Sequence, residues 1–449
     1  MKVKRLKMNS FRGISDLTLE FHETEPTVFI GINGVGKSSI LDCLAVLLSP
    51  LIELIQNPTG SGRLFSKQDI TNGHQQTNNE ITISVDSQTV TWSVIQVRKD
   101  SFPLKEAVNY YTKALRLLQS SIDLIGEIDE NHQLLEVTGE LEELKAVGNE
   151  IRSRWKANSN VNLPLVVYYP VNRAVLDISL EIPEKQSFEQ TDAYQQASSG
   201  VQIGFGSFFQ WFRVLEDLEN EDRRDDPNYR NLQLEAVRQA IYSLLPNFSN
   251  LRVRRSPLRM TVTKQGQELI INQLSDGEKC LLAMVGDLAR RLAIANPSLP
   301  DPLQGSGVVL IDEIELHLHP KWQREIIPAL TRTFPNCQFI VTTHSPQVIS
   351  QVKPEGIYIL ERTDAGIVAM RPESSYGRDS NRILEDLMDT PERPQEIKES
   401  LLELFRLIAR GELDSARQLH QKIADEIGAD EPELVGASVS IRRREILGR

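Results

Sequence analysis

The segment that most constrains this chain is 31–38, GINGVGKS, which matches the pattern G-x-x-x-x-G-K-[ST]. It follows a short β-rich run at 27–30 and precedes a predicted helix from Ser38 to Leu48, which we expect Pro50 to end. In such a strand–loop–helix unit, glycines let backbone N–H groups turn inward on phosphate oxygens, and the helix N-terminus adds partial positive charge. The segment therefore predicts a phosphate-binding loop in an α/β fold.

The side chains of this loop have distinct expected roles. Lys37 is expected to reach the β- and γ-phosphate oxygens of ATP, and the Ser38 hydroxyl to ligate Mg²⁺. A plain glycine turn capped by serine is the alternative, and it rarely explains the whole pattern. The other residues of the segment that we expect to contact the nucleotide are Asn33, Gly34, Gly36 and Ser39.

A second element is the apolar run 307–311, which leads directly into Asp312 and Glu313. A carboxylate at the end of a strand beside a phosphate loop can hold Mg²⁺, which is the role expected of Asp312. The next carboxylate, Glu313, is expected to orient and polarise the attacking water, and so to be catalytic. An acidic pair after an apolar strand is common by itself, but after a phosphate loop it is a strong indication of phosphoryl chemistry.

His317 and His319 follow the acidic pair two residues apart. On a strand this spacing would suit a pair of metal ligands. No third ligand is evident nearby, so we favour a polar turn before a helix that covers Trp322 to Leu330.

Two further segments complete an ordered set of motifs. Residues 274–279, LSDGEK, are predicted to open a helix, and residues 339–346, FIVTTHSP, form a predicted strand that ends in a histidine. The order phosphate loop, LSDGEK, Asp-Glu, Thr-Thr-His-Ser resembles the ATP-binding-cassette (ABC) ATPase superfamily, in its soluble RecF/Rad50/SMC-like branch. Residues 9–14, NSFRGI, resemble the same branch.

The resemblance implies roles that the residues alone do not. Ser275 and Gly277 match the signature motif, which in this family closes over the ATP held by another subunit, so a homodimer or higher oligomer is expected. His344 matches the switch histidine that contacts the γ-phosphate, and Arg12 matches an arginine that approaches the nucleotide. The residues from Glu315 to Pro320 match the loop at the dimer seam.

Two points stay open at this stage. LSDGEK also fits an ordinary capping box, with Ser275 capping the helix and Glu278 completing the box. The glutamine that senses Mg²⁺ in this family has two candidate locations, which are Gln68 and the segment around Tyr169.

The resemblance also implies a fold and a domain organisation. We expect an α/β ABC-type ATPase head at 1–100 and 160–375, with a mixed sheet, a phosphate-loop lobe and a signature lobe. Apolar residues spaced like helix faces predict a helical insertion at 101–159. A helical region at 376–449 is expected to serve partner binding or oligomerisation.

A narrower resemblance covers more of the chain. The short insertion, the segment 167–173 (VYYPVNR), and the C-terminal segments 375–379, 401–416 and 441–448 are similar to PtuA, the ATPase subunit of Septu-type anti-phage systems. This implies that a separate, PtuB-like HNH nuclease cuts DNA while this chain supplies ATP hydrolysis and assembly. No nuclease centre is expected within the chain itself.

Composition bears on the alternatives. The 449 residues carry a net charge of −12, which argues against a protein coated in basic groove. A DNA repair or recombination ATPase that binds DNA directly remains the main alternative, and the nucleotide-binding subunit of a transporter is a weaker one. The basic clusters that DNA binding would need, each of which we favour as a solvated face, are Lys2, Lys4, Arg5 and Lys7; Arg252, Arg254, Arg255 and Arg259; and Arg442, Arg443 and Arg444.

Location in the cell follows from three features. Three scattered cysteines suit neither a disulfide framework nor a zinc cluster. No membrane-spanning run is expected, and the basic N-terminus lacks the apolar stretch of a signal peptide. We therefore expect a cytoplasmic protein.

Overall fold

The computed structural model describes residues 1–60, 62–86, 88–98, 135–139, 141–158, 160–173, 188–198, 200, 203–364 and 366–447. The chain divides into two compact units, Met1–Arg378 and Asp379–Arg449.

The first unit is built around a six-stranded sheet with the order β14-β13-β3-β12-β11-β7. The strands from β13 to β7 run parallel, and β14 adds an antiparallel edge. The central strands β3, β12, β11 and β7 are buried along their whole length, as expected for a parallel sheet covered on both faces. The six strands are β3 (Thr27–Ile30), β7 (Leu165–Tyr169), β11 (Gly307–Ile311), β12 (Cys337–Thr342), β13 (Ile357–Thr363) and β14 (Gly366–Met370).

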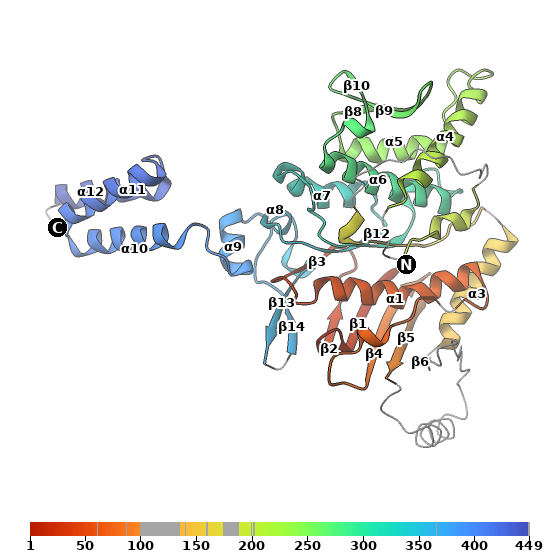
Figure 1. Cartoon of the computed structure of the whole chain (residues 1–449), viewed down its shortest axis with the longest axis horizontal. Coiled ribbons are helices and arrows are strands. Elements are labelled where there is room, and N and C mark those ends of the chain that lie inside the picture. The colour runs from red at the N-terminus through yellow and green to blue at the C-terminus, as the bar shows by residue number, and fades with distance from the viewer. Residues whose placement is uncertain are drawn as a thin grey trace. The chain divides into compact units, whose positions relative to one another are not determined.

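A second, antiparallel sheet has the order β2-β1-β4-β5-β6. Helix α1 (Lys37–Gln56) lies between the two sheets (Figure 1), and the indole N–H of Trp92 on β5 donates to the carbonyl of Leu47 on α1 at 2.9 Å. The five strands are β1 (Lys2–Phe11), β2 (Ile14–Glu20), β4 (Gln76–Val85), β5 (Gln88–Val97) and β6 (Leu135–Gly139).

Helix α1 corrects one prediction, because Pro50 lies inside the helix and does not end it. A proline has no N–H for the carbonyl four residues earlier, which here belongs to Val46. The hydroxyl of Ser49 donates to that carbonyl at 2.8 Å instead, so the helix continues to Gln56. By length and hydropathy α1 could cross a membrane, but most of it is buried inside the unit, so it is a core helix.

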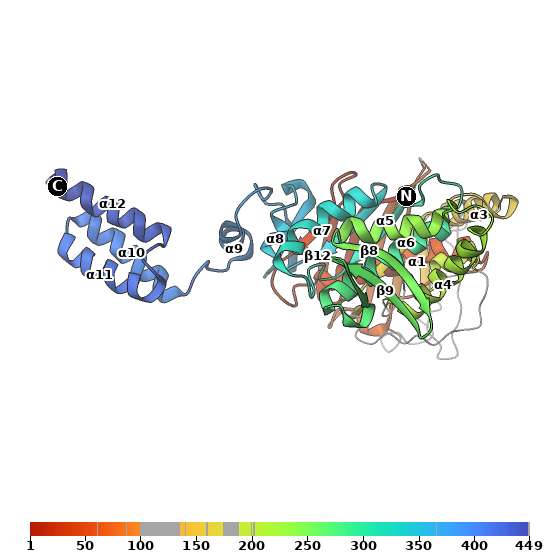
Figure 2. The same ribbon diagram turned by 90° about the horizontal axis from the view of Figure 1, so that it is seen from above.

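The other face of the six-stranded sheet is covered by helices, and a three-stranded ribbon of order β10-β9-β8 lies beyond them, beside α4 and α5 (Figures 1 and 2). Helix α4 packs closely on α6, where a side chain at Gly286 would lie 3.0 Å from the ring of Phe208. These elements are α4 (Phe205–Asp222), α5 (Leu232–Leu244), α6 (Asp276–Ala295), α7 (Pro320–Thr333), α8 (Pro346–Ile349), β8 (Phe248–Arg255), β9 (Leu258–Lys264) and β10 (Gln267–Ile270).

The predicted helical insertion differs from the structure in one part. Helix α3 (Leu141–Ala157) is helical as predicted, but Leu135–Gly139 forms strand β6, which extends the antiparallel sheet beside β5. Propensity cannot foresee this pairing, because the partner strand lies about forty residues earlier in the chain. The prediction for residues 101–134 falls outside the described residues.

The second unit consists of helices α9 (Ser380–Met388), α10 (Gln395–Arg410), α11 (Leu413–Ile427) and α12 (Pro432–Leu447). The last three share a small aliphatic core, and Arg393 pairs with Glu431 and Glu433 at its edge. The core side chains are Leu401, Leu404, Ile408, Ala416, Ile423, Leu434, Ala437 and Ile441.

Candidate nucleotide-binding site

The phosphate loop connects β3 to α1 as predicted. Gly31, Gly34 and Gly36 have φ of 143°, 76° and 109°, a region that favours glycine. Gly31 also needs to be small, because a Cβ there would lie 2.5 Å from the carbonyl oxygen of Leu360 on β13. Asn33, Gly34 and Ser38 are exposed, so the loop faces solvent.

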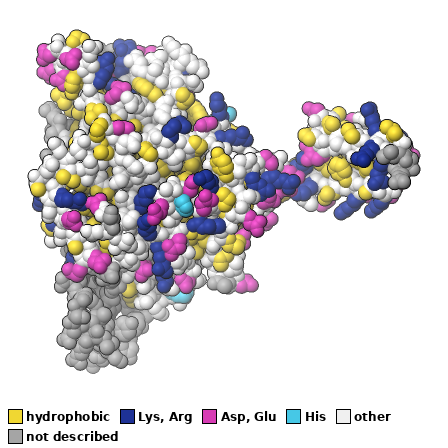
Figure 3. All heavy atoms as spheres, turned by 180° about the vertical axis from the view of Figure 1, so that it is seen from behind, with side chains coloured by type: hydrophobic (Ala, Val, Ile, Leu, Met, Phe, Trp, Pro, Cys, Tyr) yellow, Lys and Arg dark blue, Asp and Glu magenta, His cyan; other side chains and the backbone are white. Residues whose placement is uncertain are grey.

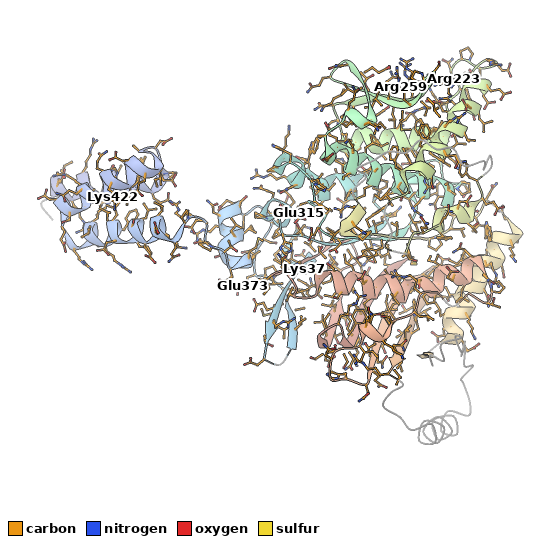
Figure 4. All side chains as sticks on the ribbon, viewed as in Figure 1. Lys37, Arg223, Arg259, Glu315, Glu373 and Lys422 are labelled. Atoms are coloured by element: carbon orange, nitrogen blue, oxygen red, sulfur yellow. The ribbon has the colours of Figure 1, made fainter. Side chains whose placement is uncertain are left out.

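Lys37 is the first residue of α1, and its ammonium group bends back over the loop (Figure 4). It donates to the carbonyl oxygens of Gly31 and Ile32 at 2.8 and 3.0 Å. Burial lowers the pKa of Lys37, while the charges of Asp312, Glu313 and Glu315 oppose that shift. The structure thus brings the loop lysine and the acidic pair into one electrostatic cluster.

Asp312 and Glu313 follow β11 directly, as predicted. Asp312 is almost fully buried, and its carboxylate accepts a hydrogen bond from the hydroxyl of Thr342 on β12. The same hydroxyl accepts the N–H of Glu313 at 2.7 Å, and the N–H of Ile314 donates to the Thr342 carbonyl at 3.0 Å. Glu313 has a φ of 46°, which is costly for a residue that is not glycine, so these bonds hold a strained backbone in place.

His344 lies in the loop that follows β12. Its backbone N–H donates to the carboxylate of Glu315, which also accepts from the hydroxyl of Thr343 at 2.7 Å. Burial, followed by the charge of Lys37, lowers the pKa of His344, while Glu315, Glu313 and Asp312 oppose the shift. Glu315 therefore links the turn after β11, which begins with Asp312 and Glu313 and is called the acidic turn, to the loop after β12 that contains His344.

Arg173 is a residue of this cluster that the sequence reasoning missed. It lies in the short helix Val171–Arg173 after β7, and only 3% of it is exposed. Its guanidinium donates to the carbonyl oxygens of Asp312 and Glu313, the latter at 2.6 Å. Burial lowers the pKa of Arg173, and neighbouring acidic groups on Cys280, Asp312, Glu315 and Glu313 oppose the shift. The feature that could have indicated Arg173 is its position shortly after β7, the strand that pairs with β11.

Arg12 lies in the turn between β1 and β2. Its guanidinium donates to Asp69 at 2.6 Å and also to Asp42 on α1. Burial lowers the pKa of Arg12, but the hydrogen bonds to Asp69 and Asp42 outweigh it, so the pKa lies above its usual value. Gln68 adjoins Asp69 and is exposed.

Ser275 caps the N-terminus of α6 and Gly277 lies in its first turn. Helix α6 covers the face of the sheet opposite α1 (Figure 1). Ser275 forms the capping box with Glu278, whose carboxylate pairs with Lys264 of β9 at 2.6 Å. Gly277 packs on the acidic turn, since a Cβ there would lie 2.3 Å from the carbonyl oxygen of His317. The capping box therefore forms, and Gly277 ties the LSDGEK segment to the loop after Glu313.

His317 and His319 serve the turn, as we favoured. His317 has a φ of 62°, and His319 caps α7 by accepting the N–H of Lys321 at its Nδ1. Among the described residues no group of three or more His, Cys, Asp or Glu side chains could hold a metal ion by itself.

A phosphate loop, an acidic pair after β11 and a histidine after β12, all at one edge of a parallel sheet, define an ABC-type ATPase head of the RecF/Rad50/SMC-like branch. The comparisons agree with this class. A family model described as "AAA domain" matches residues 5–249, and one described as "AAA domain, putative AbiEii toxin, Type IV TA system" matches residues 155–350.

Three relatives are similar to the chain over most of their length. It is 30% identical to the Retron Ec83 probable ATPase of Escherichia coli, over 99% of this chain and 87% of that protein. It is 31% identical to the Retron Vc95 probable ATPase of Vibrio cholerae serotype O1 biovar El Tor, over 92% of this chain and 85% of that protein. The Septu protein PtuA of Bacillus thuringiensis is 24% identical, over 87% and 85%. The chain belongs to the AAA-domain family of these retron ATPases, and it is an ATPase.

Solved structures include similar chains at low sequence identity. The SmcHead bound to the C-winged helix domain of ScpA aligns with a TM-score of 0.45 and 14% identity, over 83% of this chain and 98% of that one. The SMC head domain from Thermotoga maritima aligns with a TM-score of 0.41 and 14% identity, over 83% and 100%.

Proposed function

We propose that this chain is the ATPase of an anti-phage defence complex, and that two copies close over ATP to control a separate HNH nuclease that acts on DNA. The observation that carries the proposal is that two elements suited to phosphate, the loop before α1 and the LSDGEK segment before α6, begin helices that cover opposite faces of the sheet. Lys37 lies with the acidic cluster beside α1, whereas Ser275 opens α6 across the sheet. A helix N-terminus with a serine cap suits a phosphate, and a second copy would supply one.

The residues of the site would divide the chemistry as follows. Lys37 and the backbone N–H groups of 33–39 would bind the phosphates, and the Ser38 hydroxyl with the Asp312 carboxylate would hold Mg²⁺. Hydroxyl and carboxylate oxygens are the hard donors that Mg²⁺ prefers, so this pair fits the ion. When bound, Mg²⁺ would neutralise charge that develops on the phosphates. Glu313 would accept a proton from the attacking water, and His344 would contact the γ-phosphate.

The link to defence rests on the relatives, which are named as ATPases of retrons and as Septu proteins. In this proposal the nuclease is PtuB-like, and DNA reaches the complex chiefly through it. The helical region 376–449 would bind the partner or a second copy. The three cysteines that the structure describes are buried, and the proposal places the complex in the cytoplasm.

Direct DNA binding of the RecF/Rad50 type is the alternative, and the charge distribution of the described residues does not favour it. Figure 3 shows a face of the first unit where Lys and Arg side chains are interspersed with Asp and Glu. On β8, Arg252 and Arg254 both bond Glu268, while Arg255 bonds Glu216 and Asp217. DNA affinity that persists without a partner and falls steeply with salt would favour this alternative.

The test of the assembly uses Glu313→Gln, which should bind ATP but hydrolyse it slowly. We expect its mass in solution to rise from about one chain to about two on addition of MgATP, measured by light scattering after gel filtration. Glu221→Gln, on the exposed part of α4, is the matched control and should hydrolyse ATP normally. A Glu313→Gln protein that stays monomeric while saturated with ATP would contradict the closed dimer.

The test of the partner is co-purification with the product of the neighbouring gene, which the proposal expects to be an HNH nuclease. The pair should survive gel filtration, and its DNA cleavage should change when Lys37→Ala replaces the wild-type chain. A neighbourhood without a nuclease gene, or cleavage that ignores the nucleotide state, would contradict the defence assignment.

A further inference from the structure

The acidic turn holds its catalytic candidate in a costly backbone conformation. Glu313 has a φ of 46° although it is not glycine, and such a residue is held there only when its surroundings impose it. Its N–H is fixed by Thr342 from β12 on one side. The side chain that fixes its C=O from the other side comes from Arg173, after β7.

The guanidinium of Arg173 is suited to this position for a geometric reason. The planar guanidinium can donate to two acceptors at once, and here it donates to the carbonyl oxygens of two consecutive residues, Asp312 and Glu313. It also donates to the carbonyl of Pro170 at 3.2 Å, so the turn after β7 and the turn after β11 are joined. A shift of Arg173 would therefore release both carbonyls of the acidic pair together.

The burial of this side chain shows that the contact is not incidental. A charged group that is 3% exposed loses its hydration and persists only with compensation. The two carbonyl dipoles supply part of that compensation, and the carboxylates of Asp312, Glu313 and Glu315 supply more. Arg173 thus interacts with the same three carboxylates as Lys37.

We propose that Arg173 is a positioning residue for ATP hydrolysis: by holding the carbonyls of Asp312 and Glu313, it keeps the Glu313 backbone left-handed and its carboxylate aimed at the attacking water. The inference rests on the proposed role of Glu313 as the base. It assigns Arg173 no contact with ATP, so ATP affinity should not depend on it.

A residue with a purely structural role would behave differently from a positioning residue. Replacing a residue with only a structural role lowers stability and all activities together, whereas replacing a positioning residue lowers turnover and leaves ATP binding intact. A second difference appears when the base is already absent. If Arg173 acts through Glu313, its removal should have little further effect in a Glu313→Gln protein.

The experiment compares Arg173→Met, Arg173→Lys, Glu313→Gln and the double variant Arg173→Met/Glu313→Gln. Turnover is measured by phosphate release, ATP affinity by calorimetry with Mg²⁺, and folding by thermal unfolding. Arg63→Met is the matched control, because Arg63 also donates to a backbone carbonyl, that of Ser198, outside the acidic turn.

We expect Arg173→Met to lower kcat roughly 10- to 100-fold, a fraction of the effect of a general base, while the Kd for ATP changes less than about threefold. Arg173→Lys can still donate to one carbonyl and should recover about a tenth or more of the wild-type kcat. The double variant should lie within about twofold of Glu313→Gln. Arg63→Met should retain wild-type kcat.

The outcomes separate this inference from the proposed function. Normal turnover of Arg173→Met beside an inactive Glu313→Gln would overturn the inference alone, as would an equal fold-loss on both backgrounds. A fully active Glu313→Gln would overturn the proposed base, and the inference with it. If Arg173→Met does not fold, Arg173→Lys takes its place in the cycle, with a severalfold loss of kcat at unchanged Kd as the expected result.

Discussion

The phosphate loop and the acidic turn both place backbone in the left-handed region, but they do so by different means. In the loop, Gly31, Gly34 and Gly36 adopt positive φ because they lack a Cβ. In the turn, Glu313 and His317 adopt it despite their side chains. The loop therefore reaches its positive φ through its own glycines, although Gly31 also packs on Leu360 of β13, whereas the turn depends on residues of neighbouring elements.

The largest expected effect tests the loop. Lys37→Ala removes the charge that lies beside the acidic cluster and that we expect to bind phosphate, so ATP affinity should fall by about 3 kcal/mol, roughly a hundredfold. Calorimetric titration with ATP measures this directly. Lys422→Ala, an exposed position on α11, should bind ATP like the wild type. An unchanged affinity in Lys37→Ala would remove the phosphate-loop assignment.

A second prediction tests how closely the turn is packed. In Gly277→Ala the new Cβ would lie 2.3 Å from a backbone oxygen of His317, so α6 or the turn must move. We expect a loss of about 1–3 kcal/mol in the free energy of unfolding, measured with urea, together with slower ATP turnover. Gly436→Ala is the control, since α12 leaves open space there and helix propensity favours alanine. Equal stability of Gly277→Ala and the wild type would show that the turn is not held by this contact.

A third prediction addresses the hydrogen bonds of the turn. Thr342→Val keeps the shape of the side chain but removes the hydroxyl that serves both Asp312 and Glu313. The expected cost is about 1–2 kcal/mol in unfolding free energy, with a larger relative loss in turnover than in ATP binding. Thr331→Val removes a hydroxyl that bonds only carbonyls of its own helix and should be nearly neutral. A Thr342→Val enzyme with wild-type turnover would mean that Glu313 needs no support from β12.

The smallest expected effect is that of a substitution in the phosphate loop. A Cβ at Gly34 meets nothing within 4 Å, so Gly34→Ala should cost only the left-handed strain, about 1 kcal/mol in unfolding free energy without nucleotide. Gly13 has a φ of 88° and equally open surroundings, so chemical denaturation should show the same loss of unfolding free energy in Gly13→Ala. A much larger loss at Gly34 alone would show that the loop depends on packing as well as on glycine.

This contrast explains what the sequence could and could not predict. The phosphate loop was predictable because its pattern, its strand and its helix are contiguous. The positions of Asp312 and His344 at the ends of β11 and β12 were predictable too, since the carboxyl ends of parallel strands meet at one edge. Arg173 was not, because its partners are backbone carbonyls about 140 residues away, and a carbonyl leaves no mark on the sequence.

Two fold predictions failed for related reasons. Pro50 stays inside α1 because Ser49 takes the carbonyl that the proline leaves without a donor, a rescue visible only in three dimensions. Leu135–Gly139 forms a strand because β5 offers a free edge, although its spacing resembled a helix face. In both cases a contact outside the local pattern decided the outcome.

The central claim is that each ATP is held by the phosphate loop of one copy and the LSDGEK segment of another. The most direct measurement is the ATPase rate of Lys37→Ala and Ser275→Arg chains produced together, when each alone is inactive. Random pairing makes half the dimers mixed, each with one intact site of two, so the account predicts about a quarter of the wild-type rate. A mixture as inactive as its parents, although mixed dimers are shown to form, would contradict it.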